Sequence, residues 1–391
     1  MTEKLYYQNA YLNTFEACVI SSEKKGDIYE IVLDKTAFFP EEGGQYSDSG
    51  NINGVEVFSV REERGVIYHL ALAPFEVGAN VVGTVNFEER YEKMQCHTAE
   101  HILSGLIHSL YGLNNVGFHL GREEVTMDIS APLTEAQLFE VERLANEVVY
   151  SNTEVEQLFP TAEEASNLSY RSKLDIKEGL RIIKIGDVDL CACCAPHVSR
   201  TGEIGTVKIL DFAGLRGGIR IRIAAGRRAY RIFSKMQENL AKISNLLSVP
   251  KLECADAAEK LAADFADVKG RFKSFRIDYY KNLGEAVHEC DGTLVCTFIG
   301  ADYDEMRAFS NAASDKVSGM LVLISELNGG VKYIISSHTQ QMNVEIKKIN
   351  TALCGKGGGN AIMVQGSFGT DTDTVEKYFA YEYGATVSPR R

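Results

Sequence analysis

Short apolar segments separated by turn residues fill the first part of the chain, residues 1–85. The segments at 29–34 and 55–60 alternate or run apolar over the length of a β-strand. Between short apolar segments stands the pair Asn53-Gly54, which is typical of a two-residue hairpin turn. Many short strands with frequent turns predict a small N-terminal β-barrel.

Helical periodicity begins near residue 86 and opens a second region, residues 86–228. Apolar residues three and four positions apart continue until Gly112, and Thr134 is the predicted N-cap of a second amphipathic helix. Strand-like segments follow the helices, at 117–129, 180–185 and 207–211. Helices and strands in this arrangement predict an α+β domain.

Two helices are predicted in residues 229–287, and Pro250 separates them. Apolar residues of the second helix alternate spacings of four and three, which is the seam of a heptad repeat: Leu261, Phe265, Val268, Phe272, Phe275 and Tyr279. Two helices around a proline turn indicate an antiparallel helical hairpin that acts as an arm or a dimerisation element. An internal spacer is an equal alternative.

The last region, residues 288–391, reads as a small α/β domain. Strands are predicted at 293–299, 319–325 and 332–337, and helices at 303–314 and 343–353. Its most unusual segment is glycine-rich and begins at Gly355. Backbone amides of Gly357, Gly358 and Gly359, next to Lys356, can cradle a phosphate or a ribose. No Gly-Lys-Ser/Thr closes the segment, so ATP use is not predicted. The alternative is a plain connection between helix and strand.

Composition narrows the class of protein. The 391 residues are 45% hydrophobic and 24% charged, as in ordinary globular proteins. No apolar run approaches the ~20 residues that span a bilayer, and the N-terminus lacks the apolar core of a signal peptide. We therefore expect a cytoplasmic protein without a membrane partner. Nine cysteines in such a chain indicate reduced thiols and a metal site rather than disulfides.

The chain is acidic overall but contains one strongly basic segment. The net charge of −13 argues against a protein that coats nucleic acid non-specifically. Residues 216–231 nevertheless contain no acid and six arginines, among them Arg216, Arg220 and Arg222. Guanidinium groups pair bidentately with phosphate oxygens, so this segment is a candidate phosphate-binding face. The alternative is a solvated strand face whose arginines pair with acids elsewhere in the chain.

Two segments together indicate a metal site. His97-Thr-Ala-Glu-His101 places two histidines four residues apart on one face of the predicted helix, a common way to offer two nitrogens to a metal. The segment 191–197, Cys-Ala-Cys-Cys-Ala-Pro-His, adds a thiolate and an imidazole, which completes a ligand set suited to Zn²⁺. The histidine pair alone would equally fit buried, hydrogen-bonded imidazoles.

A glycine-containing segment in residues 36–50 carries further polar candidates. Gly43 and Gly44 allow the backbone to approach another group closely, and Thr36, Gln45 and Asp48 offer short polar side chains. A glycine turn between two strands is the simpler alternative, and local physics alone favours it.

In this order, the separate motifs resemble those of AlaX-type alanyl-tRNA editing proteins, free-standing relatives of the editing half of alanyl-tRNA synthetase. Residues 36–45 resemble the family's glycine motif, His97–His101 its HxxxH motif and Cys193–His197 its CxxxH motif. Residues 355–360 resemble the glycine signature of the C-terminal, DHH-associated domain of the long members. The four in series are far more specific than any one, and they cover nearly the whole chain.

This resemblance implies hydrolysis of mischarged tRNA(Ala), chiefly the seryl ester and secondarily the glycyl ester. It implies one Zn²⁺ per chain, held by His97, His101, Cys193 and His197. Thr36 matches the threonine that senses the serine hydroxyl, and the C-terminal domain would grip the tRNA, with the helical hairpin as spacer or dimer contact. Gln45 matches the glutamine that closes the glycine motif.

The chain departs from the family pattern at several positions. The family's Cys-Gly-Gly-Thr-His is here Cys-Cys-Ala-Pro-His, so Cys191 and Cys194 compete with Cys193 as metal ligand, and spacing from His197 favours Cys193. Glu42 stands where many members have glycine.

The motifs are also compatible with other residue roles and other functions. Glu100 is a candidate general base, although a solvent-exposed helix glutamate is its simpler role. A set of four protein ligands is nominally closed, as in structural zinc sites, so a non-catalytic tRNA-binding protein with structural zinc is the main alternative. His97–His101 also fits the H-x-x-E-H pattern of some metalloproteases, which the Cys193/His197 pair and the arginine-rich segment disfavour.

Overall fold

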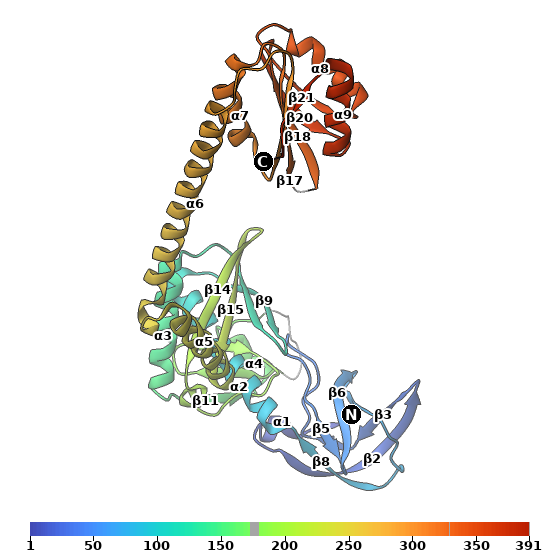
Figure 1. Ribbon diagram of the computed structural model, residues 1–391. Coiled ribbons are helices and arrows are strands. Elements are labelled where there is room, and N and C mark those ends of the chain that lie inside the picture. The colour runs from blue at the N-terminus through green and yellow to red at the C-terminus, as the bar shows by residue number, and fades with distance from the viewer. Residues whose placement is uncertain (173–179, 328, 391) are drawn as a thin grey trace. The chain divides into compact units, whose positions relative to one another are not determined.

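The computed structural model describes residues 1–172, 180–327 and 329–390. The chain divides into two compact units, Met1–Lys242 and Ile243–Arg391, which are described separately below (Figure 1). None of the helices in the described residues combines the length and the apolar character needed to cross a bilayer. The predicted mixture of helices and sheets is confirmed in both units.

Six strands at the start of the first unit form one closed sheet, in the order β2-β3-β7-β6-β5-β8. Their bounds are β2 Thr14–Lys25, β3 Ile28–Leu33, β5 Gly50–Ile52, β6 Val55–Glu63, β7 Val66–Ala71 and β8 Asn80–Val85. The turn between β5 and β6 is the predicted Asn53-Gly54 hairpin, because both residues have positive φ, +48° and +83°. The interior is filled by buried apolar side chains such as Phe15, Ile31 and Phe38.

Three short elements complete this region: β1 (Glu3–Lys4), α1 (Leu5–Gln8) and β4 (Lys35–Thr36). Strands β1 and β4 pair in parallel, so the N-terminal segment lies beside Thr36, the first residue of the glycine motif. Tyr6 of α1 is fully buried against Phe39, with 5.4 Å between the ring centroids.

The second region of the same unit is organised around the long helix α2, Phe87–Tyr111. Asn86 caps its first turn by accepting a hydrogen bond from the backbone of Glu89, and Gly112 ends it in the left-handed conformation at φ +67°. The predicted helix end at Gly112 is thus confirmed. The second predicted helix is α3, Glu135–Tyr150, and Thr134 is its N-cap, as predicted.

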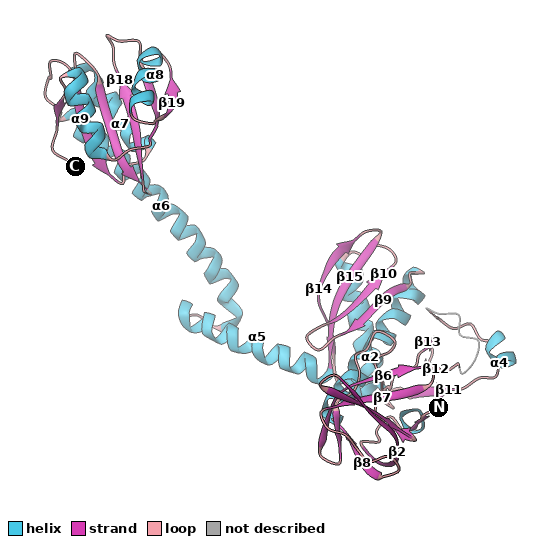
Figure 2. Cartoon of the chain, turned by 90° about the vertical axis from the view of Figure 1, so that its right-hand side faces the viewer, coloured by secondary structure: helices cyan, strands magenta, loops and turns pink. Residues whose placement is uncertain are grey.

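Helices α2 and α3 pack on a four-stranded antiparallel sheet. The strand order of this sheet is β14-β15-β10-β9 (Figure 2). Its strands are β9 Asn115–Leu120, β10 Val125–Ile129, β14 Val207–Leu215 and β15 Gly218–Ala225. A three-stranded sheet, β11-β12-β13, lies beside them and leads to residues 193–197, which follow β13 and are called the metal loop below. Its strands and the short helices nearby are β11 Val155–Leu158, α4 Ala162–Ser166, β12 Ile182–Ile185, β13 Asp189–Ala192 and the 3-10 helix η1, Thr201–Ile204.

Two helices occupy the region of the predicted hairpin: α5, Gly226–Leu247, and α6, Cys254–Glu285, with the 3-10 helix η2 (Lys251–Glu253) before α6. The boundary between the units falls within α5. The six residues of the heptad seam lie on α6, and each is 52–68% exposed. The seam is therefore a row of apolar side chains open to solvent, while packing of the two helices as a hairpin stays a prediction.

The second unit is a six-stranded mixed sheet with helices on both faces. The strand order is β19-β20-β18-β17-β16-β21. Side chains of alternate strand residues enter two cores, one under α8 and α9 and the other under α7 and the end of α6. The bounds are β16 Leu294–Ile299, α7 Tyr303–Ala313, η3 Ser314–Lys316, β17 Leu321–Leu327, β18 Gly330–Ser336, α8 Met342–Ala352, β19 Lys356–Gly359, β20 Met363–Phe368, α9 Thr372–Tyr383 and β21 Thr386–Val387.

The glycine-rich segment of this unit is a strand and not the helix-to-strand connection that was the alternative. Residues Lys356–Gly359 form the edge strand β19, which pairs with β20. A Cβ atom on Gly357 or on Gly366 opposite would lie 2.6 Å from the hydroxyl of Tyr333, so glycine is required there by packing. Gly358 has open space around its Cα, and Lys356 is exposed.

Candidate metal centre

Four side chains converge where α2 meets the loop after β13. A ligand atom from each of His97, His101, Cys193 and His197 lies within 4.8 Å of the others. The Sγ atom of Cys193 is 3.3 Å from Nε2 of His197 and 3.6 Å from Nε2 of His97. The three histidines are each only 2–3% exposed. These four residues could hold a metal ion, and they are the set that the two motifs predicted.

The competing cysteines are placed differently. Cys191 groups with His101 and Asp189 but not with the other two histidines. Cys194 lies against the glycine motif, where a Cβ atom on Gly43 would be 3.3 Å from its Sγ, and burial together with the nearby Cys193 and Glu42 raises the pKa of its thiol. Only Cys193 lies among all three imidazoles, which agrees with the choice based on its spacing from His197.

Nδ1 of His101 is held by an ion-paired carboxylate. Nδ1 of His101 is 2.8 Å from Oδ2 of Asp189, and Asp189 is itself held by Arg171 through contacts of 2.7 and 2.9 Å. Because a carboxylate accepts, Nδ1 carries the proton and Nε2 is left free to bind a metal. A second shell of this kind is what metal-binding histidines usually have.

Thr98 orients His197 in the same way, with Nδ1 as the donor and Nε2 free. The hydroxyl of Thr98 donates to the backbone carbonyl of Met94 at 2.8 Å, so its oxygen accepts from Nδ1 of His197 at 3.0 Å. Burial lowers the pKa of His197 to about 3. The imidazole is therefore neutral near pH 7 and presents Nε2 as a free electron pair, which is the state that coordinates a metal.

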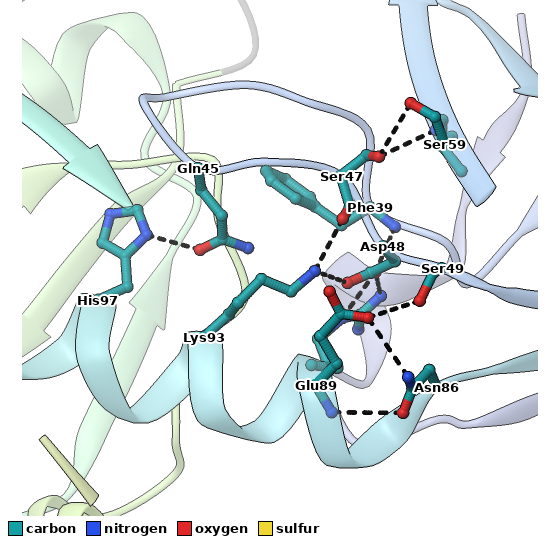
Figure 3. Close-up of polar contacts among 12 residues, drawn as sticks. Phe39, Gln45, Ser47, Asp48, Ser49, Ser59, Asn86, Glu89, Lys93 and His97 are labelled. Atoms are coloured by element: carbon teal, nitrogen blue, oxygen red, sulfur yellow. Dashed lines mark hydrogen bonds and ion pairs between the residues drawn. The ribbon is translucent and has the colours of Figure 1, made fainter. Parts of the chain in front are cut away.

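Gln45 of the glycine motif orients His97 (Figure 3). Its Oε1 accepts from Nδ1 of His97 at 2.9 Å, which leaves Nε2 of His97 on the side of Cys193. The amide nitrogen of Gln45 is buried and has no hydrogen-bond partner among the described residues. A buried donor without a partner is costly, so this amide is the group most suited to receive a ligand oxygen beside the metal centre.

The two glycines of the motif explain how Gln45 reaches α2. Gly43 and Gly44 have φ of +63° and +79°, which favours glycine. A Cβ atom on Gly44 would lie 2.3 Å from the backbone oxygen of Phe118 in β9, and one on Gly43 would lie 3.3 Å from Sγ of Cys194. The turn therefore packs directly on β9 and on the metal loop, so the close approach predicted from the sequence is to these two segments.

Buried charges join the glycine motif to α2 one turn before His97 (Figure 3). The carboxylate of Asp48 accepts from Nε of Arg90 at 2.8 Å and lies 2.9 Å from Nζ of Lys93. Lys93 also donates to the backbone carbonyl of Ser47 at 2.8 Å, and Asp48 accepts from the backbone of Phe39 at 2.7 Å. The three charged side chains are at most 1% exposed. The sequence marked Asp48 as polar but gave no sign of its two partners.

Thr36 lies in the barrel core with its hydroxyl already engaged. Nδ1 of His69 is 3.0 Å from the carbonyl of Ile31, which can only accept, so Nε2 of His69 is unprotonated. The hydroxyl of Thr36 therefore donates to that nitrogen at 2.8 Å and accepts from the backbone of Phe38 at 3.1 Å. Burial lowers the pKa of His69 to about 4, which keeps the ring neutral. His69 had no distinguishing signal in the sequence.

Glu100 is buried and not solvent-exposed, so the simpler role considered for it is wrong. It is 4% exposed, and its Oε1 accepts from the hydroxyl of Ser104 at 2.5 Å and from the side-chain amide of Asn115. The metal-binding group of four does not include it.

A buried arginine that sequence reasoning missed holds the metal loop. Nη1 of Arg181 donates to the carbonyls of Cys193 and Ala195, each at 2.8 Å. Its Nε and Nη2 donate to Oε1 of Gln157 at 3.1 and 3.0 Å. Arg181 fixes the backbone on both sides of Cys194. A lone arginine within an otherwise apolar strand sequence was the available signal.

The arginine-rich segment is largely paired with acids. Arg220 forms a bidentate pair with Asp128, at 2.7 and 2.8 Å, and Arg222 pairs with Asp211. Arg216 lies exposed between β14 and β15. The solvated, acid-paired alternative thus describes Arg220 and Arg222, and a phosphate would have to displace carboxylates there.

Comparisons with known proteins agree with the motifs. Residues 180–225 match the family model described as the Threonyl and Alanyl tRNA synthetase second additional domain. The chain is 28% identical to the alanyl-tRNA editing protein AlaX-L of Pyrococcus horikoshii over 388 residues, 94% of each chain. It is 31% identical to the alanine–tRNA ligase of Halobacterium salinarum over 363 residues, 85% of this chain and 38% of the ligase.

Other similarities are partial. The alanine–tRNA ligase of Methanococcus maripaludis is 27% identical over 395 residues, 96% of this chain and 43% of the ligase. The chain therefore spans less than half of these ligases. Among solved structures, the C-Ala domain of Aquifex aeolicus alanyl-tRNA synthetase matches 22% of this chain and 86% of its own, with 16% identity and a TM-score of 0.21.

Proposed function

The chain resembles the AlaX-type alanyl-tRNA editing proteins over nearly its whole length, and from this premise we propose that it is an aminoacyl-tRNA deacylase. The proposed substrate is tRNA(Ala) mischarged with serine first and glycine second. The observation that carries the proposal is the unpartnered amide of Gln45 beside the four metal-binding side chains. A structural metal site has no need of a buried donor without a partner.

The residues present fit Zn²⁺, at one ion per chain. Three imidazoles with Nε2 free and one cysteine are a nitrogen and sulfur set that suits zinc. A zinc ion bound there supplies a Lewis acid that can activate water or polarise an ester carbonyl. The protein side chains do the remaining work of orienting the substrate and stabilising charge.

Gln45 has two roles in the proposed reaction. Its Oε1 orients His97, and its amide N–H groups donate to the carbonyl oxygen of the aminoacyl ester as negative charge develops on it. Thr36 is proposed to accept the hydroxyl of a seryl substrate, because its own proton is committed to His69. Glu100 stays a candidate general base that would have to exchange its bonds with Ser104 and Asn115.

Contacts with the body of the tRNA are assigned by the same proposal to two surfaces. Arg216, Arg220 and Arg222 would contact phosphates near the acceptor end. Arg220 and Arg222 already pair with Asp128 and Asp211, whereas Arg216 lies exposed. Lys356 and the open backbone of Gly358 in β19 would contact the tRNA from the second unit. The proposal assigns these roles to the four regions predicted from the sequence, which are residues 1–85, 86–228, 229–287 and 288–391.

A non-catalytic tRNA-binding protein with structural zinc is the second candidate, because four protein ligands form a nominally closed shell. Deacylation of Ser-tRNA(Ala), Gly-tRNA(Ala) and Ala-tRNA(Ala) by the purified chain, with zinc measured on the same sample, separates the two. We expect fast loss of serine with alanine spared and about one zinc per chain. Zinc present with every ester intact would favour the binding protein.

Replacing Cys193 by serine should remove the metal. Within the described residues, Cys193 is the one cysteine whose Sγ lies among all three imidazoles, so zinc content should fall from about one per chain to about a tenth or less. Elemental analysis of the purified variant gives the answer. Cys191→Ser and Cys194→Ser are matched controls that should retain zinc. Loss of zinc in a control but not in Cys193→Ser would show that the ligand register is wrong.

The exposed seam of α6 is proposed as a dimer contact with a second copy of the chain. Its residues follow the a and d positions of a heptad repeat and are open to solvent. Phe265→Glu combined with Phe272→Glu should convert a dimer to a monomer in light scattering. Ala263→Glu, on the opposite face of the helix, should leave the mass unchanged. A monomeric parent would refute this contact.

A further inference from the structure

Glu42 stands at the exposed turn of the glycine motif, next to the metal loop. Its backbone N–H donates to the carbonyl of Gln45 at 3.1 Å, and the N–H of Gln45 donates back to Glu42 at 3.0 Å. The two residues thus face each other across the turn. Because the side chain of Gln45 bonds His97, this pairing places Glu42 on the turn next to the candidate metal centre, and the turn itself is open to solvent.

Cys194 lies beside this turn. It is next in sequence to the predicted ligand Cys193, and the nearby Glu42 is among the groups that raise the pKa of its thiol, after burial and Cys193. The backbone of Gly43 passes so close to Cys194 that an added Cβ would lie 3.3 Å from its Sγ. Both positions depart from the AlaX pattern stated above, in which glycine occupies each of them. Two departures that contact each other in the fold indicate one device that belongs to this chain.

The carboxylate of Glu42 forms no ion pair within the described parts of the chain. The nearby cations are engaged elsewhere. Lys4 is 2.7 Å from Glu62, and Arg181 is bound to two carbonyls of the metal loop and to Gln157. A carboxylate without an ion-paired cation is suited to bind one, because charge-assisted hydrogen bonds are stronger than neutral ones.

We infer that Glu42, on the turn that packs against Cys194, binds the α-ammonium group of the aminoacyl ester and makes a free amino group a condition of tight binding. This inference rests on the proposed function. In an aminoacyl ester the ammonium-bearing carbon is bonded to the ester carbonyl carbon, and Glu42 and Gln45 face each other across one short turn. The carboxylate receives the ammonium while the amide of Gln45 receives the carbonyl oxygen. Esters with an acylated nitrogen, including peptidyl-tRNA, are therefore poor ligands.

Binding of a stable substrate analogue tests the inference without turnover. The probe is adenosine with serine attached through a 3′-amide, which keeps the ammonium group, and its N-acetylated form is the matched probe. By calorimetry the zinc-loaded parent should bind the free amine about tenfold more tightly than the acetylated probe. Glu42→Gln should lose that tenfold preference, and its affinity for the acetylated probe should equal that of the parent. Glu41→Gln, on the same turn, should behave as the parent.

Three outcomes would overturn the inference: parent-like binding of the free amine by Glu42→Gln, equal loss of both probes with zinc retained, or no binding of the free amine by the parent. The proposed function is judged by a separate measurement. A parent that binds the free amine selectively but leaves Ser-tRNA(Ala) intact refutes deacylation and not the recognition of the ammonium group. A parent that hydrolyses Ser-tRNA(Ala), with Glu42→Gln unchanged in kcat and KM, refutes only the role of Glu42.

Discussion

Replacing Gln45 by methionine should lower kcat for Ser-tRNA(Ala) by about 10²- to 10³-fold, the usual effect of losing one donor to a developing oxyanion. Methionine has a similar length but offers no amide N–H groups. The buried amide nitrogen of Gln45 has no other described partner, so its loss breaks no bond within the protein, whereas loss of Oε1 leaves Nδ1 of His97 without its acceptor. Single-turnover deacylation with zinc-loaded protein measures the effect.

A second substitution separates the two roles of Gln45. Gln45→Glu keeps an acceptor for Nδ1 of His97 but removes the amide donor. If the donor matters, both variants lose activity, whereas Gln45→Glu retains zinc as tightly as the parent. If Gln45 only orients His97, Gln45→Glu should be nearly as active as the parent and only the methionine variant should bind zinc more weakly, by about 10- to 100-fold.

Asp48→Asn should lower the free energy of unfolding by about 3–5 kcal/mol, because it leaves Arg90 and Lys93 buried without their shared counter-charge. Urea denaturation of the full chain gives the difference through the transition of the first unit. Glu140→Gln is the matched control. Glu140 also pairs with an arginine, Arg143, at 2.8 Å, but both side chains are exposed, so its loss should leave the free energy of unfolding nearly unchanged. A cost for Asp48→Asn no larger than that of Glu140→Gln would contradict the expected role.

The ion pairs of Asp48 with Arg90 and Lys93 also predict that folding stability depends on pH. Burial alone would raise the pKa of Asp48, but Arg90 and Lys93 outweigh it and lower the pKa to about 2. A folded-state pKa below the unfolded value means that the contribution to stability is complete above about pH 4 and is lost as the pH falls toward 2. The stability difference between the parent and Asp48→Asn should shrink across that window. A constant difference from pH 5 to pH 2 would contradict this assignment.

Local sequence was sufficient for features that depend on near neighbours. The hairpin at Asn53-Gly54 follows from two residues that tolerate positive φ, and the end of α2 follows from Gly112 in the left-handed conformation. The histidine pair follows from the helical repeat, and its CxxxH partner from spacing. The glycine-rich edge strand β19 was not identified, because the need for glycine at position 357 comes partly from Tyr333, which lies on another strand.

The sequence by itself determined the main helices and strands, the two halves of the candidate metal centre and the resemblance to AlaX-type proteins, since each depends on residues close together in the chain. Only the tertiary structure decided which cysteine joins the histidines, which side chain holds each imidazole, and that Asp48 neutralises two cations of α2. It also decided that Arg220 and Arg222 are paired and that the turn of the glycine motif packs on Cys194. These contacts join residues about 10 to 150 positions apart, and hydrophobic periodicity carries no information about such pairs.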